Sequence, residues 1–353
     1  MSPWGGGAHG GALRSAQLAE LVQRALPDAV HHEAPQPRTL PRGVLAALAM
    51  RGTAMALVTR KPPFEGFLAA WLDRTLAGLG LSNGDLIIYD ADRRFGPALM
   101  RSARMRGLKT IVLPHNIEAL IPVTWPIAVD PVQTATRLRA ELAWLRGADQ
   151  LWSIGTLDCD LLQLFGLEAR LLPYAPSETR RDELLGVRAS RRAPGSHVLI
   201  LGTVHNSPTR AGMLEQLAMV RQLQRTGQCP SVVLAGFGTE LLQPEAGPGV
   251  RVVGGQSWPG VLQLLEEASA LWVHQTPMSG AVTRISESLI AGVPVVANHW
   301  AARGHRAAPG LEVYGTANEL ARLLASPRAA FDVPDNSADE DAFIAALRQA
   351  AGI

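Results

Sequence analysis

The chain has 353 residues, of which 47% are hydrophobic and 18% charged, and its formal net charge is +2 at pH 7. These values are typical of an ordinary globular protein and exclude a disordered or fibrous chain. The length exceeds what one hydrophobic core normally supports, so two domains are expected. No apolar run reaches the ~18 residues of a membrane span and the N-terminus lacks the features of a signal peptide, so a cytoplasmic location is predicted.

The first half of the chain alternates short runs of Val, Ile and Leu with longer segments of helical period. Strands are predicted at 55–59, 85–89, 110–113, 150–153 and 169–172, with helices at 64–77, 97–106, 133–145 and 157–164. This alternation indicates βαβ units and a parallel sheet. The Gly-rich segment 5–11 should follow a first strand, yet only four residues precede it. Either that strand is absent or the protein begins further upstream.

The polar, Pro-flanked stretch 173–196 has no clear apolar period and is interpreted as a linker. The alternation then restarts, with strands predicted at 197–201, 231–235, 250–253, 270–274 and 294–297 and helices near 210–225, 258–268, 283–291 and 316–325. We therefore divide the chain into an N-terminal Rossmann-like domain (1–174), a linker (175–196), a C-terminal domain (197–335) and a final segment (336–353). The helix 339–351 in that segment is expected to pack back on the first domain.

Both halves thus predict doubly wound α/β domains. Such domains bind ligands at the carboxyl ends of their strands, so two of them facing one another create a single cleft. The first domain is the more basic, because residues 38–110 carry twelve Lys or Arg against five Asp or Glu. This excess suits a phosphorylated acceptor, an anionic membrane at its inner face, or nucleic acid, with a solvated helix face as the ordinary alternative. Nucleic acid is disfavoured because the stretch 93–109 lacks interleaved aromatic residues.

The most informative stretch is 279–298, SGAVTRISESLIAGVPVVAN. A Gly-containing loop leads into a helix that carries Arg284 and Glu287 and stops at Gly292. Loop amides and a helix N-terminus bind anions, and Arg284 adds a full positive charge. A carboxylate such as Glu287 can accept hydrogen bonds from both hydroxyls of a ribose. The stretch therefore predicts a nucleotide-diphosphate site, the alternative being that Arg284 and Glu287 form an ordinary surface pair.

This stretch resembles the G-x-x-x-[KR]-[IVL]-x-E-x-x-x-x-G-x-P-V-V signature of group 1, or family 4-like, glycosyltransferases. The matching positions are Gly280, Arg284, Glu287, Gly292 and the Pro-Val-Val run 294–296. The strand ending at 202, the run 232–238 and the segment 250–273 stand before it in the expected order. The resemblance implies a GT-B fold, a nucleotide-diphosphate sugar as donor, no cofactor or required metal, and transfer to a hydroxyl of a sugar, lipid or small molecule, usually with retention at the anomeric carbon.

For the donor, the resemblance implies Glu287 as the ribose-binding residue. It implies Gly280, Thr283 and Arg284 as the phosphate-binding loop and helix start. Gly236, in the run 232–238, belongs to the same site. Trp258 lies in the segment that contacts the nucleobase in this family, where it would stack on the base or, alternatively, simply pack in the core.

The chain also departs from the family at two places. The family's second glutamate, which contacts the donor sugar, is replaced by Ser279. The family's Arg/Lys pair after the first strand of this domain is altered too, and Arg210 is the nearest surviving cation. Arg210 is predicted to stabilise the leaving β-phosphate, with a helix-surface arginine as the alternative. We place Ser279 and Arg210 in the predicted catalytic set.

In the first domain, Gly6, Gly7 and His9 match the position of a GG loop that faces donor and acceptor in similar transferases. His115 and Asn116 resemble the family's H-N-x-E segment at the edge of the cleft. His115 is the predicted catalytic residue of this domain, because a His at the carboxyl end of a strand can bind a sugar hydroxyl or move a proton. The alternative is a cap for the following turn.

No metal site is predicted. Cys159 and Cys229 stand without CxxC or His-rich company, so neither zinc nor a disulfide is indicated. Asp90 and Asp92 imitate an Asp-x-Asp metal motif, but the donor signature lies in the other half of the chain, so turn formation or contact with the acceptor explains them better.

Two rival functions stay open on the same fold. One is a nucleotide-sugar epimerase or hydrolase, which would bind the donor without an acceptor. The other is a catalytically silent GT-B subunit that supports an active partner, which the replacement at Ser279 favours.

Overall fold

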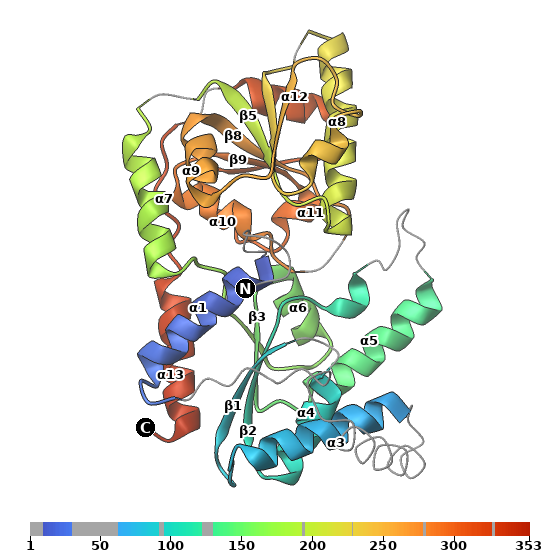
Figure 1. Cartoon of the computed structure of the whole chain (residues 1–353), viewed down its shortest axis with the longest axis vertical. Helices are drawn as coiled ribbons and strands as arrows, with labels where there is room; N and C mark the ends of the chain where they lie inside the picture. The colour runs from blue at the N-terminus through green and yellow to red at the C-terminus, as the bar shows by residue number, and fades with distance from the viewer. Residues whose placement is uncertain are drawn as a thin grey trace.

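The computed structural model describes residues 10–29, 63–91, 95–121, 130–192, 195–227, 229–277, 280–326 and 329–353. These residues form two α/β domains, stacked along the long axis of the molecule with the N-terminal domain below in Figure 1. The predicted strand 55–59 and the segment 5–9 lie outside the described residues. Within the described part of the chain, no helix combines the length and the apolar character that crossing a bilayer requires.

The N-terminal domain contains a four-stranded parallel sheet in the order β1-β2-β3-β4. Val112 of the second strand is buried on one face of this sheet, in a core shared with the helices between residues 63 and 164. Its neighbours Ile111 and Leu113 face the opposite side. Burial on both faces explains why this strand is a continuous apolar run rather than an alternating one. The strands are β1 (Leu86–Ala91), β2 (Lys109–Pro114), β3 (Gln150–Ser153) and β4 (Ala169–Leu171), and the helices are α3 (Pro63–Gly78), α4 (Gly96–Met105), α5 (Pro131–Leu145) and α6 (Thr156–Leu164).

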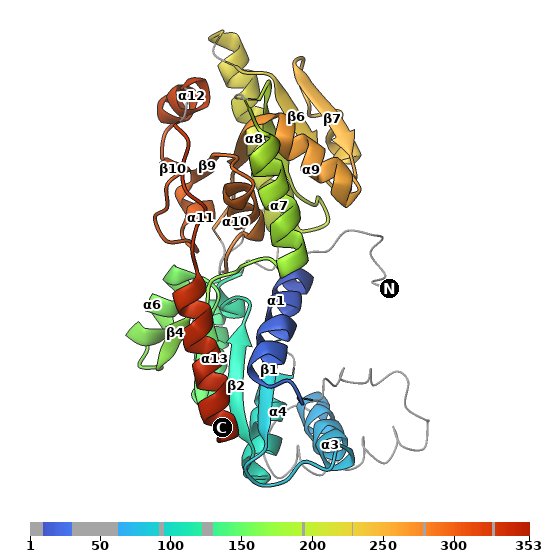
Figure 2. The same ribbon diagram turned by 90° about the vertical axis from the view of Figure 1, so that its left-hand side faces the viewer.

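The second face of this sheet is covered by helices from both ends of the chain. Helix α1 (Gly10–Ala25) and helix α13 (Ser337–Ala351) lie side by side there (Figure 1, Figure 2). Phe343 of α13 packs edge-on against Trp152, with ring centroids 5.1 Å apart. Helix α13 therefore lies against the sheet of the first domain.

The C-terminal domain contains a six-stranded parallel sheet in the order β10-β9-β8-β5-β6-β7. This is the order of the classic dinucleotide-binding fold, in which the chain reverses direction across the sheet between its first and fourth strands, here β5 and β8. Its strands are β5 (His197–Leu201), β6 (Val232–Ala235), β7 (Val250–Gly254), β8 (Ala268–Val273), β9 (Val295–Asn298) and β10 (Leu311–Tyr314). The helices are α8 (Ser207–Arg225), α9 (Trp258–Glu267), α10 (Thr283–Ile290), α11 (His299–Ala302) and α12 (Ala317–Ala325). The predicted elements of both halves are confirmed to within a few residues wherever the chain is described, whereas α11 and β10 were not predicted.

One secondary-structure expectation is wrong. The stretch 173–196, expected to lack regular structure, contains helix α7 (Glu178–Ser190). Leu184 and Val187 of this helix are buried in the core of the C-terminal domain, where α7 packs against α9 and α10 (Figure 2). Its large apolar side chains are confined to one short stretch, 184–187, which is too short to give a clear period, so pattern analysis does not detect the helix.

The carboxyl ends of the two sheets meet between the domains. The Thr156 hydroxyl donates to the Arg303 carbonyl (2.8 Å), and the Gly280 amide donates to Asp158 Oδ2 (2.7 Å). We call this region the domain junction and define it by residues 115–116 and 155–158 of the first domain and 280–284 and 303–304 of the second.

Candidate functional site

The point where the strand order of the C-terminal sheet reverses is where ligands of such folds bind. Here the loops after β5 and β6 touch at their backbones. Gly236 has φ of +121°, and a Cβ atom on it would overlap the carbonyl of Gly202. Only glycine permits this approach, which explains the glycine directly after β6. The predicted residue Gly236 therefore lies against the loop after β5, which borders the reversal point.

Arg284, in the first turn of α10, points to the same place. Its guanidinium carbon lies 3.8 Å from the position that a Cβ on Gly202 would take. The amide of Gln275 is oriented so that both its nitrogen and its oxygen have hydrogen-bond partners. In this orientation the oxygen accepts from Arg284 Nη2 at 2.9 Å. Among the described residues, the buried Nε of Arg284 has no hydrogen-bond partner, and no carboxylate pairs with its guanidinium. Burial lowers the pKa of Arg284 to about 10, so the side chain is still charged at neutral pH.

The N-terminus of α10 adds to this positive region. Its cap residue, Val282, has no side-chain oxygen, so the first amides of the helix are not capped by a side chain. Thr283 lies beside the start of α1, its hydroxyl 3.4 Å from the position of a Cβ on Gly10. Two helix N-termini therefore converge at the domain junction, and their dipoles favour an anion there.

Glu287, the predicted ribose ligand, is 7% exposed and already engaged. Arg180 of α7 binds both of its oxygens, at 2.5 Å to Oε1 and 3.1 Å to Oε2. The Tyr174 hydroxyl donates to Oε1 at 2.8 Å. Burial and the nearby charge of Glu287 raise the pKa of Tyr174, which keeps the phenol protonated as a donor. Any ribose at Glu287 must displace these partners.

Trp258 belongs to the same cluster. The Arg180 guanidinium lies 3.4 Å from the centroid of its ring, a cation–π contact, and Trp258 Nε1 donates to Glu183 at 2.6 Å. One face of the indole is therefore covered by Arg180. Trp258 also packs on the core of the C-terminal domain, and stacking on a base would need the other face of its ring.

His115 and Asn116 follow β2 and reach the domain junction, as does Gly280. Gly280 has φ of +86°, and a Cβ on it would clash with Asn116 Oδ1 and with the His115 carbonyl, 2.8 Å away. Asn116 Nδ2 donates to Glu118 Oε1 at 2.9 Å. The structure thus brings together two first-domain residues and one second-domain residue that the sequence had singled out separately.

Asp90, which the sequence analysis assigned to turn formation or contact with the acceptor, lies at the same edge of the sheet. Its Oδ1 is hydrogen-bonded to His115 Nε2, and its Oδ2 accepts from the Ser15 hydroxyl. Asp90 is near the end of β1, and His115 follows the neighbouring strand β2. Carboxyl ends of neighbouring parallel strands meet at one edge of a sheet.

The remaining predicted residues have different outcomes. Arg210 is exposed in the first turn of α8. Ser279, Gly6, Gly7 and His9 lie outside the described residues, and their roles stay predictions. In the part of the chain that is described, no group of three or more His, Cys, Asp or Glu side chains is arranged to hold a metal ion.

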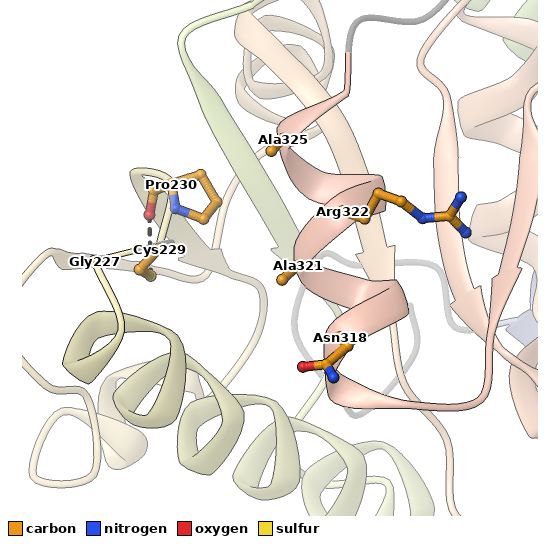
Figure 3. Close-up of a pocket in the computed structure, with 7 residues that line it drawn as sticks. All are labelled: Gly227, Cys229, Pro230, Asn318, Ala321, Arg322 and Ala325. Atoms are coloured by element: carbon orange, nitrogen blue, oxygen red, sulfur yellow. Dashed lines mark hydrogen bonds between the residues drawn. The ribbon is translucent and has the colours of Figure 1, made fainter.

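A pocket elsewhere in the C-terminal domain contains none of the predicted site residues. Figure 3 shows it between the turn before β6 and helix α12. It is lined by Gly227, Cys229, Pro230, Asn318, Ala321, Arg322 and Ala325. Burial raises the pKa of the Cys229 thiol, so this cysteine is not an activated nucleophile.

A scan against models of protein families finds no match, and a search of curated proteins finds none either. Comparison with solved structures does find similar folds. The UDP-forming alpha,alpha-trehalose-phosphate synthase from Burkholderia vietnamiensis superposes with a TM-score of 0.58 at 14% identity, over 82% of this chain and 77% of that one. The corresponding enzyme from Burkholderia xenovorans gives 0.58 at 15% identity, over 82% and 79%. Anabaena HepE in complex with UDP-glucose gives 0.50 at 14% identity, over 90% and 92%.

The chain has the GT-B fold. Identities of this size establish the fold alone, so the predicted fold class is confirmed, whereas membership of the group 1 transferases stays a prediction. In the GT-B architecture seen here, the reversal point of the C-terminal sheet and the carboxyl edge of the N-terminal sheet face the same domain junction.

Proposed function

We propose that the chain is a glycosyltransferase that binds a nucleotide-diphosphate sugar in its C-terminal domain and transfers the sugar to a hydroxyl acceptor. The observation that carries the proposal is Arg284, a largely buried guanidinium without a carboxylate partner among the described residues, at the strand-reversal point of a dinucleotide-type sheet. A buried cation destabilises the folded protein unless an anion lies beside it. A site that binds an anion retains this destabilisation while the anion is absent. The GT-B fold and its likeness to UDP-forming and UDP-glucose-bound proteins make a diphosphate the natural anion.

The same group explains how the leaving diphosphate would be stabilised. As the bond to the sugar breaks, negative charge grows on the β-phosphate, and a fixed cation in a low-dielectric site lowers the energy of that state. Arg284 and the uncapped start of α10 supply this positive potential. Because these groups neutralise the phosphates, the proposed reaction needs no metal, and a chelator is expected to leave it unchanged.

The ribose would bind Glu287, as the family signature implies, after Arg180 has moved away from its carboxylate. Both oxygens of Glu287 are taken by Arg180 in the structure, so this exchange is part of the proposal. The same observation favours a second candidate, a catalytically silent GT-B subunit, in which the Arg180–Glu287 pair is permanent and holds α7 against α10. The two candidates differ in whether a nucleotide binds.

The test is isothermal titration calorimetry with UDP, GDP, ADP and TDP on the wild type, Arg284→Gln and Arg225→Gln. We expect one diphosphate to bind and Arg284→Gln to weaken it about tenfold or more, since a charge-assisted phosphate contact is lost. Arg225→Gln is the matched control, because it removes an equal charge from an exposed position in the last turn of α8. If the folded wild type binds none of the four, the transferase proposal fails and the silent subunit takes its place.

A further inference from the structure

Glu287, the predicted ligand of the ribose, has most of its hydrogen-bonding capacity filled by the protein itself. An ionised carboxylate offers about four lone-pair positions on its two oxygens. Oε1 accepts from Arg180 Nε at 2.5 Å and from the Tyr174 hydroxyl at 2.8 Å, and Oε2 accepts from Arg180 Nη2 at 3.1 Å. Both hydroxyls of a ribose therefore cannot bind Glu287 while Arg180 stays in place.

Arg180 is fixed by more than the carboxylate. Its guanidinium lies over the ring of Trp258, and that ring is held in turn by the hydrogen bond from Nε1 to Glu183. The side chain of Glu287 is 9% exposed and that of Arg180 is 20% exposed, so solvent screens the pair weakly. A guanidinium that binds both oxygens of a carboxylate in such surroundings is a strong competitor for a neutral hydroxyl.

The exchange of Arg180 for a ribose requires only a side chain to move. Helix α7 is anchored independently of this pair, because Arg188 donates to two carbonyls at the end of α10 and Leu184 is fully buried. Arg180 lies in the first turn of the helix, about two turns before Arg188. Its guanidinium can therefore leave Glu287 without unpacking α7.

A site distinguishes ribose from 2′-deoxyribose mainly through the penalty for a missing hydroxyl. Where a buried carboxylate is satisfied only by the substrate, an analogue without the hydroxyl is rejected, because the carboxylate is left unpaired. Glu287 is not left unpaired, since Arg180 and Tyr174 satisfy it in the free protein. A ribose gains its two hydrogen bonds only by breaking the two from Arg180, so the 2′-hydroxyl adds little to the free energy of binding.

We propose that Arg180 is a specificity-determining residue of the donor site. It acts as an internal ligand of Glu287 and thereby makes the site insensitive to the 2′-hydroxyl of the nucleotide. This inference rests on the proposed function and extends its donor class: 2′-deoxyribonucleoside diphosphates, TDP among them, bind as well as the corresponding ribonucleoside diphosphates. The glutamate that implies ribose recognition in the family signature does not confer selectivity for ribose in this chain.

The experiment measures the binding of matched nucleotide pairs to the full chain by isothermal titration calorimetry. The pairs are UDP, GDP and ADP with their 2′-deoxy forms, and TDP with its ribose form. For the pair that binds, we expect the Kd of the deoxy form to exceed that of the ribose form by a factor of about 3 or less in the wild type. Arg180→Met removes the internal ligand, so this ratio should rise to about 10 or more, chiefly because the ribose form binds more tightly.

A second variant keeps the positive charge and changes its shape. An ammonium group is a compact point charge without the planar fork of a guanidinium, so Arg180→Lys cannot hold both oxygens of Glu287 in the same way. Its ratio should therefore lie above that of the wild type and below that of Arg180→Met. If Arg180→Met does not fold, a ratio in Arg180→Lys equal to the wild-type value is the result that contradicts the inference.

Arg181→Met is the matched control. It removes the same charge from the adjacent position, which lies about 100° further around the helix, where the arginine acts on the charge of Asp335. The ratio of the two Kd values in this variant should equal that of the wild type.

The outcomes separate this inference from the proposed function. A wild-type ratio of about 10 or more would mean that Glu287 recognises the 2′-hydroxyl despite Arg180, and would overturn the inference. A ratio that the substitutions of Arg180 leave unchanged would overturn it as well. In both cases a diphosphate still binds, so the proposed transferase stands. Only the absence of binding of every nucleotide to the folded wild type counts against the proposed function itself.

Discussion

Two arginines with the same lowered pKa have opposite surroundings. Burial lowers the pKa of both Arg14 and Arg284 to about 10. Arg14 is bonded to Gln17 and to the carbonyls of residues 172 and 173, and the charges of Asp90 and Glu340 partly offset its burial. Arg284 has burial alone as the cause of its shift. A folded-state pKa below the unfolded value means that the charged form costs stability throughout the pH range below about 10.

Replacing Arg284 should therefore stabilise the ligand-free protein. We expect Arg284→Met to raise the free energy of unfolding by about 1–2 kcal/mol in urea titrations at pH 7, because a largely buried cation without a counter-charge is exchanged for an apolar side chain. Arg14→Met, the matched variant, should lower it by about 2–4 kcal/mol, because it orphans buried acceptors. Equal destabilisation of the two variants would mean that Arg284 is an ordinary structural arginine.

At this scale the sequence predicted which residues matter better than what they contact. Arg284 and Glu287 stand in one short motif, so their types and spacing were visible. The partner of Glu287 was not, because Arg180 lies 107 positions earlier in a stretch without apolar period. The bond of Asp90 to His115 was hidden for the same reason, since it exists only once two parallel strands are paired.

Among the elements, helix α7 holds the C-terminal domain together mainly through arginines. The last carbonyls of a helix have no partner within it. Arg188 donates to the carbonyls of Leu289 and Ile290 at the end of α10, and Arg191 donates to those of Leu265 and Glu266 at the end of α9. Arginines thus satisfy the ends of two helices, and their charge also complements the negative ends of the helix dipoles. A few apolar side chains together with these arginines can therefore anchor a helix that pattern analysis interprets as a linker.

Arg191→Met tests this anchoring. The variant leaves the carbonyls at the end of α9 without their donor, so we expect the free energy of unfolding to fall by about 1–3 kcal/mol. Arg192→Met is the control, because the neighbouring arginine is exposed. Differential scanning calorimetry of both variants gives the comparison. Equal midpoints for the two would show that Arg191 does not contribute to anchoring α7.

Over the whole molecule, two parallel sheets buried on both faces produce the apolar runs that made the fold class predictable. How the two domains contact one another could not be predicted in this way. Contacts such as Gly280 with Asn116 and Thr156 with Arg303 join segments far apart in the chain, and no local pattern encodes them. What the sequence did provide was the glycine itself, since the family signature begins at Gly280.

Gly280 fixes how closely the two domains approach. Any other residue there meets two separate costs, the strain of φ at +86° and the clash of its Cβ with Asn116. Gly227 shares the first cost but not the second, because its φ is +69° and no atom lies within 4 Å of its Cβ position. Gly227→Ala should therefore lose about 1 kcal/mol of unfolding free energy from strain.

Gly280→Ala should lose about 2 kcal/mol more, because Asn116 or the loop must shift. The shift would also move the start of α10 and Arg284, so binding of the diphosphate should weaken about tenfold or more in Gly280→Ala but stay unchanged in Gly227→Ala. Urea titration and calorimetry on the two variants separate these effects. If both alanines cost the same and the diphosphate binds equally well to both, the close contact of Gly280 with the first domain does not position the donor site.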